Sequence, residues 1–199
     1  MHNKIGIKIT KDKPVNIPRA KNPLKHCSAV GLARTGKRFY VQNNDISCPL
    51  ARYNLGLEEP NDKFMHELAS ILVGWGDANT QEIGLRYLKS RPKLPFAKKY
   101  IIYFPMPDSE YKPNVTIEIS MPNDLMLRIR ELTASTGESV SGFMSGVGAM
   151  CGECTAYPIL TGNSNVSVGC TGSRPGAELK QDELFFAIPE FFKGRHQEK

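Results

Sequence analysis

Apolar and polar residues alternate in several short segments of the chain, and an alternation of period two predicts half-buried β-strands. The clearest case runs from Lys4 to Ile9, where isoleucine occupies every second position. Other short apolar runs predict further strands at 39–42, 100–104, 115–120, 156–160, 166–169 and 183–188. All of these runs are far shorter than the roughly 20 apolar residues that a membrane-spanning helix needs.

A second pattern, with apolar residues three or four positions apart, predicts amphipathic helices. Phe64, Leu68 and Leu72 show this spacing most clearly. Proline or a capping residue precedes such runs, and glycine follows several of them, as at Gly137. These signals predict helices at 24–34, 49–56, 61–73, 79–89, 122–136 and 189–193.

Strands and helices in this irregular order predict an α+β fold. We expect a single domain over residues 1–199, with a mixed or mostly antiparallel sheet, helices packed on it, and a Gly/Cys-rich loop region at 139–152. No internal repeat and no long linker divides the chain. At this length a compact fold buries roughly 70% of the surface of the extended chain, so it needs no disulfide or metal to stay folded.

The formal net charge of +6 is unevenly distributed along the chain. Residues 1–25 hold seven Lys and Arg against one acid, and residues 86–99 hold six and no acid. Such stretches suit a solvated surface, an anionic cofactor or an acidic partner protein. The sequence disfavours nucleic acid, because it has no helix-turn-helix pattern, RNA-binding sheet signature or interleaving of aromatic and basic residues.

The N-terminus lacks the hydrophobic segment of an export signal, and no run could span a membrane. We therefore expect a soluble, cytoplasmic protein whose thiols are kept reduced. Five cysteines, an odd number, also argue against a framework of disulfides.

The five cysteines fall at the ends of predicted elements or in glycine-rich loops. They are Cys27, Cys48, Cys151, Cys154 and Cys170. Small neighbours leave backbone amides free to point at a sulfur-rich ion, as thiolate-bound clusters require. A single cysteine of this kind usually packs as a small hydrophobic residue. Five in such settings favour a site.

Several cysteine chemistries are compatible with the spacing. A thioredoxin-like pair at Cys151 and Cys154 is disfavoured, because no buried strand leads into it. Structural zinc could use that pair with Cys170 and be completed by Cys27, Cys48 or His26. A four-thiolate iron–sulfur cluster with ligands from distant loops also fits.

Other motifs are weaker. Glycines at 146, 148 and 152 do not make a dinucleotide fingerprint, because Cys151 occupies a position that needs glycine. Glu153, between two cysteines, is expected to be a solvated loop carboxylate rather than a proton donor.

At the cysteine-bearing segments the sequence resembles a known family. The relevant residues are 32–37, 48–51 with 55–56, 122–132, 151–153, 158–162 and 170–174. Over nearly the whole chain they resemble the uncharacterised family named domain of unknown function 169, found mainly in archaea and anaerobic bacteria. The resemblance implies an anaerobic setting and lends no activity.

In that family pattern, cysteines recur at the places of Cys27, Cys48, Cys151 and Cys170, whereas Cys154 is an extra. The leading hypothesis is therefore a cytoplasmic 4Fe–4S protein with these four ligands and a redox or cluster-handling role. Arg34 and Arg174 are expected near the cofactor, where they would bind it or an anion.

We expect the partner to be a larger redox enzyme or an electron carrier that meets the basic surface. The alternatives are a structural zinc protein, a non-enzymatic docking module with inert cysteines, and a thiol enzyme with Cys48 or Cys170 as nucleophile. The sequence leaves open whether the protein is an enzyme at all.

Overall fold

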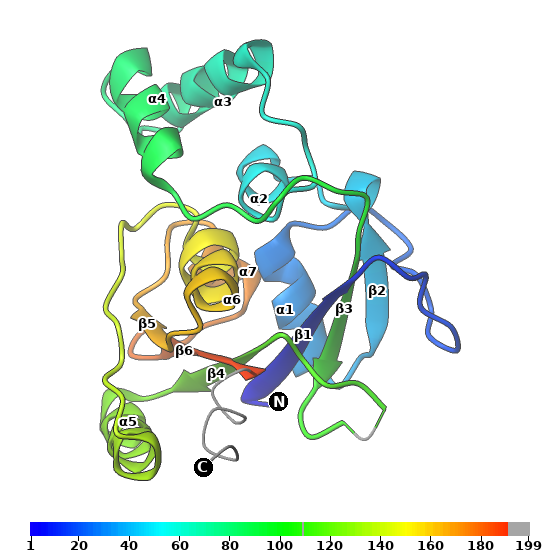
Figure 1. Cartoon of the computed structure of the whole chain (residues 1–199), viewed down its shortest axis with the longest axis vertical. Helices are drawn as coiled ribbons and strands as arrows, with labels where there is room; N and C mark the ends of the chain where they lie inside the picture. The colour runs from blue at the N-terminus through cyan, green and yellow to red at the C-terminus, as the bar shows by residue number, and fades with distance from the viewer. Residues whose placement is uncertain (109, 191–199) are drawn as a thin grey trace.

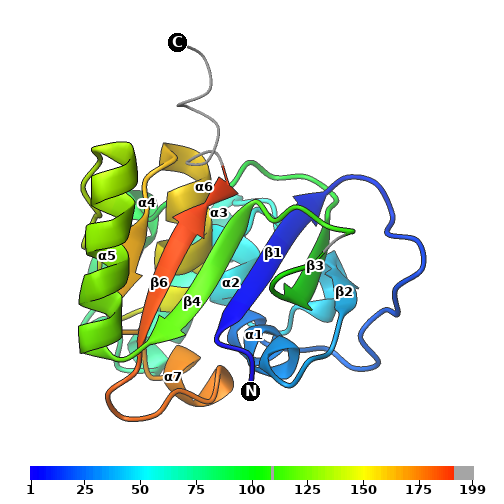
Figure 2. The same cartoon turned by 90° about the horizontal axis from the view of Figure 1, so that it is seen from below.

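A six-stranded antiparallel sheet forms the centre of the computed structural model, which describes residues 1–108 and 110–190 (Figure 2). The strand order is β2-β3-β1-β4-β6-β5. The strands are β1 (Lys4–Thr10), β2 (Phe39–Gln42), β3 (Tyr100–Pro105), β4 (Val115–Ser120), β5 (Asn165–Ser167) and β6 (Leu184–Pro189). The predicted α+β class and the antiparallel sheet are confirmed.

The alternation in β1 explains how the sheet divides its two faces. Ile5 and Ile7 are fully buried in the main core on one face. On the other face Gly6 leaves room for the ring of Phe104, since a Cβ at residue 6 would lie 2.3 Å from that ring. The period-two pattern therefore placed the core on the correct face of the central strand.

Five of the predicted helices are present, although the helix predicted at 24–34 begins at His26 and the one predicted at 49–56 ends at Asn54. They are α1 (His26–Arg34), α2 (Pro49–Asn54), α3 (Asp62–Gly74), α4 (Gln81–Ser90) and α5 (Pro122–Thr136). The side chains of Asn61 and Thr80 accept hydrogen bonds from the backbone N–H groups of Phe64 and Ile83, which caps α3 and α4. Gly137 ends α5 in the left-handed conformation with φ +74°.

The helices lie on both sides of the sheet. The main core packs the apolar side chains of α1 and α2 against one face. On the opposite face, Leu125 of α5 packs against Phe186 and Ile188 of β6. The α3–α4 pair stands away from the sheet in Figure 1 and packs on α2 through a second apolar cluster. No helix among the described residues combines the length and the apolar character that crossing a membrane requires.

The predicted strand at 156–160 is wrong, because this segment is helical. A short 3₁₀ helix, η1 (Asn43–Asp45), follows β2, and a π-helix, η2 (Ala149–Ala156), continues directly into α6 (Tyr157–Thr161). Pro158 suits the first turn of a helix but would interrupt a strand ladder. The last four residues of the loop predicted at 139–152 thus belong to η2.

Three smaller differences concern the C-terminal third. The turn of helix α7 (Ser173–Gly176) was not predicted, and β5 is shorter than the predicted strand at 166–169. β6 continues through Pro189, where a terminal helix was expected to start. The rest of that predicted helix, after residue 190, lies outside the described residues.

Glu153 is the largest correction to the sequence analysis, because its carboxylate is fully buried within η2. The backbone N–H and the hydroxyl of Ser145 donate to Glu153 at 2.8 and 2.9 Å, and the hydroxyl of Ser167 donates at 2.5 Å. The guanidinium of Arg91, equally buried, lies 3.6 Å from the carboxylate. A buried charge persists only with such partners.

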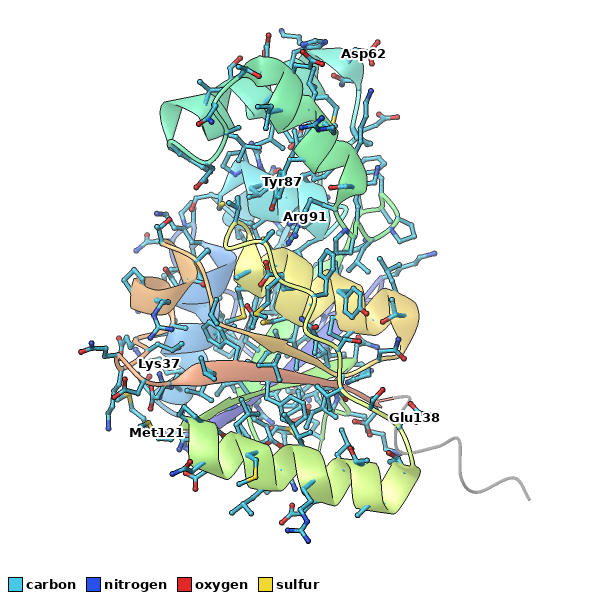
Figure 3. All side chains as sticks on the ribbon, turned by 90° about the vertical axis from the view of Figure 1, so that its left-hand side faces the viewer. Lys37, Asp62, Tyr87, Arg91, Met121 and Glu138 are labelled. Carbon is cyan, nitrogen blue, oxygen red and sulfur yellow. The ribbon has the colours of Figure 1, made fainter. Side chains whose placement is uncertain are left out.

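Arg91, which directly follows α4, also binds the glycine-rich loop that precedes η2. It donates to the hydroxyl of Ser145 at 2.7 Å and to the carbonyl of Val147 at 3.3 Å. Its guanidinium lies 5.1 Å from the ring centres of both Tyr87 and Phe143. Figure 3 shows Tyr87 and Arg91 next to each other at the base of the α3–α4 pair.

We predict that Arg91→Met destabilises the fold by about 3 kcal/mol or more, because it leaves the Glu153 carboxylate buried without a countercharge. Urea unfolding measures the effect. The matched control is Arg128→Met, which removes a partly exposed partner of Glu118 and should cost about 1 kcal/mol or less. Equal losses in the two variants would contradict the assignment, and adding Glu153→Gln to Arg91→Met should recover part of the loss.

Candidate functional site

A pocket of about 470 Å³ lies where five separate segments of the chain meet, four of which carry a cysteine. Four of the five cysteines line it, namely Cys27, Cys48, Cys151 and Cys170. The volume falls in the range of small-molecule and cofactor sites. The structure thus brings together the four cysteines that the family resemblance singled out; their role as ligands stays a prediction.

Each of these cysteines sits at or near the start of a helix. Cys27 is the second residue of α1, Cys48 directly precedes Pro49 of α2, and Cys151 is the third residue of η2. Cys170 lies just before α7. Helix α1 packs against α7 and η2, and α2 packs against η2, so that the four helix starts converge.

Close backbone contacts make this convergence possible. A Cβ at Gly31 of α1 would lie 2.4 Å from the carbonyl oxygen of Gly176, and a Cβ at Gly176 would lie 2.6 Å from the sulfur of Cys27. Only glycine at both positions allows α1 and α7 to approach so closely. The approach brings the segments of Cys27 and Cys170 to the same wall of the pocket.

Two of the sulfurs accept hydrogen bonds from N–H groups. The backbone N–H of Ser173 donates to the sulfur of Cys170 at 3.3 Å, and the hydroxyl of Ser173 accepts from the backbone N–H of Cys170 at 2.7 Å. The side-chain amide of Asn54 donates to the sulfur of Cys151 at 3.4 Å. Such N–H···S bonds stabilise negative charge on sulfur.

The thiols influence one another electrostatically. Burial raises the pKa of the Cys27 thiol, and the neighbouring sulfurs of Cys170 and Cys48 raise it further. Burial likewise raises the pKa of Cys151, and Cys48 and Cys170 add to the rise against the Asn54 hydrogen bond and the Arg91 charge. Without a cation in the pocket, Cys27 and Cys151 are therefore neutral thiols at pH 7.

The arrangement around the pocket differs from a site for a single ion. Among the residues that the structure describes, no group of three or more His, Cys, Asp and Glu side chains is placed to hold one metal ion. Cys27, Cys48, Cys151 and Cys170 instead share the lining of one cavity.

Cys154 lies apart from these four. Its side chain is fully buried in the main core and does not line the pocket. Burial raises its pKa well above the ordinary value for a thiol. In this position Cys154 packs as a small hydrophobic residue.

Arg34 and Arg174 also lie outside the pocket lining, and both bind backbone carbonyls instead. Arg34, 1% exposed, donates to the carbonyls of Ala177 and Glu178 at 2.7 and 2.8 Å. Arg174 donates to four carbonyls of the segment 168–183. These hydrogen bonds fix the segment that carries Cys170, and the expected contact of both arginines with a cofactor or an anion stays a prediction.

Sequence reasoning missed a buried hydrogen-bonded triad whose histidine, His26, lines the pocket. The ring nitrogens of His26 lie 2.6 Å from the hydroxyl of Tyr103 and 3.0 Å from that of Thr155. Thr155 donates its proton to the carbonyl of Met150, so it accepts from His26 Nε2–H, and Tyr103 donates to Nδ1. The neutral imidazole thereby joins α1, β3 and η2.

We predict that this triad makes the metal-free fold acid-sensitive. Burial lowers the pKa of His26 from 6.5 to about 3. Between these values the unfolded chain binds a proton that the folded state refuses, so stability falls as the pH falls. The loss attributable to His26 is about 2 kcal/mol at pH 5, at about 1.4 kcal/mol for each pH unit.

Urea unfolding of the wild type and of His26→Gln at pH 7.5 and pH 5 measures this loss. Glutamine keeps hydrogen-bonding atoms but does not titrate, so the variant should lose less stability on acidification. The same loss in both proteins would contradict the prediction.

Comparison with known proteins gives three findings. The model of the family domain of unknown function 169, described as uncharacterised ArCR, matches residues 2–190. An uncharacterised protein of Methanocaldococcus jannaschii is 22% identical over 191 residues, which cover 93% of this chain and 81% of that protein. No solved structure matches the chain.

Proposed function

We propose that this chain, which belongs to the family named domain of unknown function 169, is an iron–sulfur protein with a redox or cluster-handling role. The family is described only as uncharacterised, so the proposal is argued from the pocket. The observation that carries the proposal is the gathering of four cysteines from four separate segments around one cavity. Cys27, Cys48, Cys151 and Cys170 are the proposed ligands of a 4Fe–4S cluster, which takes four thiolates.

The electrostatics of the pocket supports a cationic guest. Buried thiols whose sulfurs raise one another's pKa cannot ionise together unless positive charge lies between them. Iron ions supply that charge, and the thiols release their protons as they bind.

The spread of the thiols favours a cluster over zinc. A tetrahedral zinc ion requires its sulfurs about 2.3 Å from one point. A cluster is bound through separate irons, one for each cysteine, which suits four cysteines that line one cavity.

The surroundings of the sulfurs favour redox use or cluster transfer. The N–H···S bonds from Ser173 and Asn54 are the type that sets the potential of a cluster. Cys27, Cys48 and Cys170 are partly exposed, so an acceptor can approach the pocket. We propose an electron carrier or a larger redox enzyme as the partner.

We predict that anaerobic reconstitution with iron and sulfide gives a brown protein with about four irons per chain. Cys48→Ala should lose most of the bound iron, whereas the matched control Cys154→Ala should load like the wild type. Iron and sulfide analysis with visible spectroscopy measures this. A colourless wild type, or equal loading of the two variants, would count against the proposal, and one stoichiometric zinc would select the structural-metal alternative.

We further predict that Asn54→Leu weakens metal retention by about 10–100-fold, the usual effect of removing a hydrogen bond to a ligand atom. The rate of iron release to a chelator measures the change. Asn123→Leu, at an exposed position of α5, is the control and should behave like the wild type. If both variants retain iron equally, the hydrogen bond to Cys151 does not support the cluster.

A further inference from the structure

The outer end of the cysteine pocket is built from the turn that follows α3. Trp75 and Asp77 of this turn line the same cavity as the four cysteines. The lining combines buried and exposed side chains, for example His26 with 1% and Trp75 with 53% of its surface exposed. Trp75 therefore belongs to the solvent-exposed part of the lining, together with Lys25, Ser47 and Thr171.

The exposure of Trp75 beside a cavity is unusual for so large an aromatic side chain. Trp75 is the only tryptophan of the chain, and an aromatic side chain of this size normally buries most of its surface. Trp75 instead leaves about half of its surface free beside an open cavity. The flat face of an indole is the strongest aromatic partner for a cation.

The carboxylate of Asp77 lacks a countercharge. Among the described residues, no donor hydrogen-bonds to it and no Lys, Arg or His forms an ion pair with it; only its backbone N–H is bound, to the carbonyl of Leu72 at 2.9 Å. Asp77 is half-buried, and this burial raises its pKa. A carboxylate that gives up water without gaining a partner loses stabilisation, which a positively charged ligand would restore.

The other polar groups of the pocket do not supply this charge. Lys25 also lines the cavity, but its side chain is exposed and its charge is screened by solvent. His26, the remaining basic residue of the lining, is buried and held neutral by its two hydroxyl partners. Ser47 and Thr171 contribute neutral hydroxyl groups.

We propose that the outer end of the pocket binds a small organic cation, with the Trp75 indole as its stacking surface and the Asp77 carboxylate as its countercharge. The charged group of this ligand would lie between solvent and the four cysteines. The remainder of the ligand molecule would face the sulfurs. This site goes beyond the proposed cluster and exists without it, because neither Trp75 nor Asp77 touches a metal.

Because Trp75 is the sole tryptophan, its fluorescence reports directly on this end of the pocket. The full-length protein, both metal-free and reconstituted, is titrated with choline, methylammonium and guanidinium chlorides at constant ionic strength. We expect a saturable change for at least one cation. The neutral analogue 3,3-dimethylbutan-1-ol has the shape of choline without its charge. Its affinity should be lower than that of choline by a factor of about ten or more.

The variants separate a site from unspecific quenching. Asp77→Asn should weaken binding of the cation about tenfold while leaving the response to the neutral alcohol unchanged. Asp62→Asn, on the far end of the same helix pair, is the matched control and should bind like the wild type; Figure 3 marks its position. Asp77→Glu keeps the charge and should retain part of the affinity.

The proposal is overturned if none of the three cations saturates, if choline saturates but its neutral analogue binds equally well, or if Asp77→Asn binds the saturating cation like the wild type. The titration of the metal-free protein is sufficient to decide these outcomes, so that they do not require a loaded cluster. A failed reconstitution with intact cation binding would sink the cluster alone, and the reverse outcome would sink the cation site alone.

Discussion

The buried ion pair between Arg91 and Glu153 fixes the part of the molecule on which the pocket depends. It joins the loop after α4 to a π-helix whose eight residues are all buried, and it fastens the glycine-rich loop across both. A buried pair of this kind gives little net stability, since desolvation offsets the attraction. What it gives here is a defined position for η2, and with it for Cys151, two residues before Glu153.

From that position the remaining contacts of the pocket follow by close packing. A Cβ at Gly152 would lie 2.5 Å from the Arg91 guanidinium and 3.0 Å from the Asn54 amide, and a Cβ at Gly148 would lie 3.1 Å from the same amide. The backbone of η2 thus leaves a space that the Asn54 side chain fills, where its N–H reaches the sulfur of Cys151. A substitution at Arg91 would therefore shift Cys151 indirectly, through Gly152 and Asn54, neither of which is a proposed metal ligand.

The local signals of the sequence were sufficient for most elements. Alternation gave the strands, and proline, capping residues and glycine gave the helix ends, because these effects act within a few residues. The segment 156–160 failed since its short apolar run suits a strand and a buried helix alike, and only its packing beside η2 decides between them. The prediction that Glu153 is a solvated carboxylate was wrong for the same reason. Its neighbours suggest a solvated loop, whereas its partners Arg91 and Ser167 come from other parts of the chain.

The charges of the pocket connect its two ends. Among the acidic and basic side chains of the lining, His26 is neutral, Lys25 is exposed to solvent, and Asp77 has no ion-pair partner in the described part of the chain. Asp77 is therefore the negative charge that a cation in the pocket would meet. A 4Fe–4S cluster held by four thiolates has a net negative charge. Cluster loading would then add to the attraction of the outer end for a cation. By linkage, a bound cation would stabilise the loaded pocket by the same factor. The inner and outer sites would therefore be coupled through charge alone, with no movement of the fold.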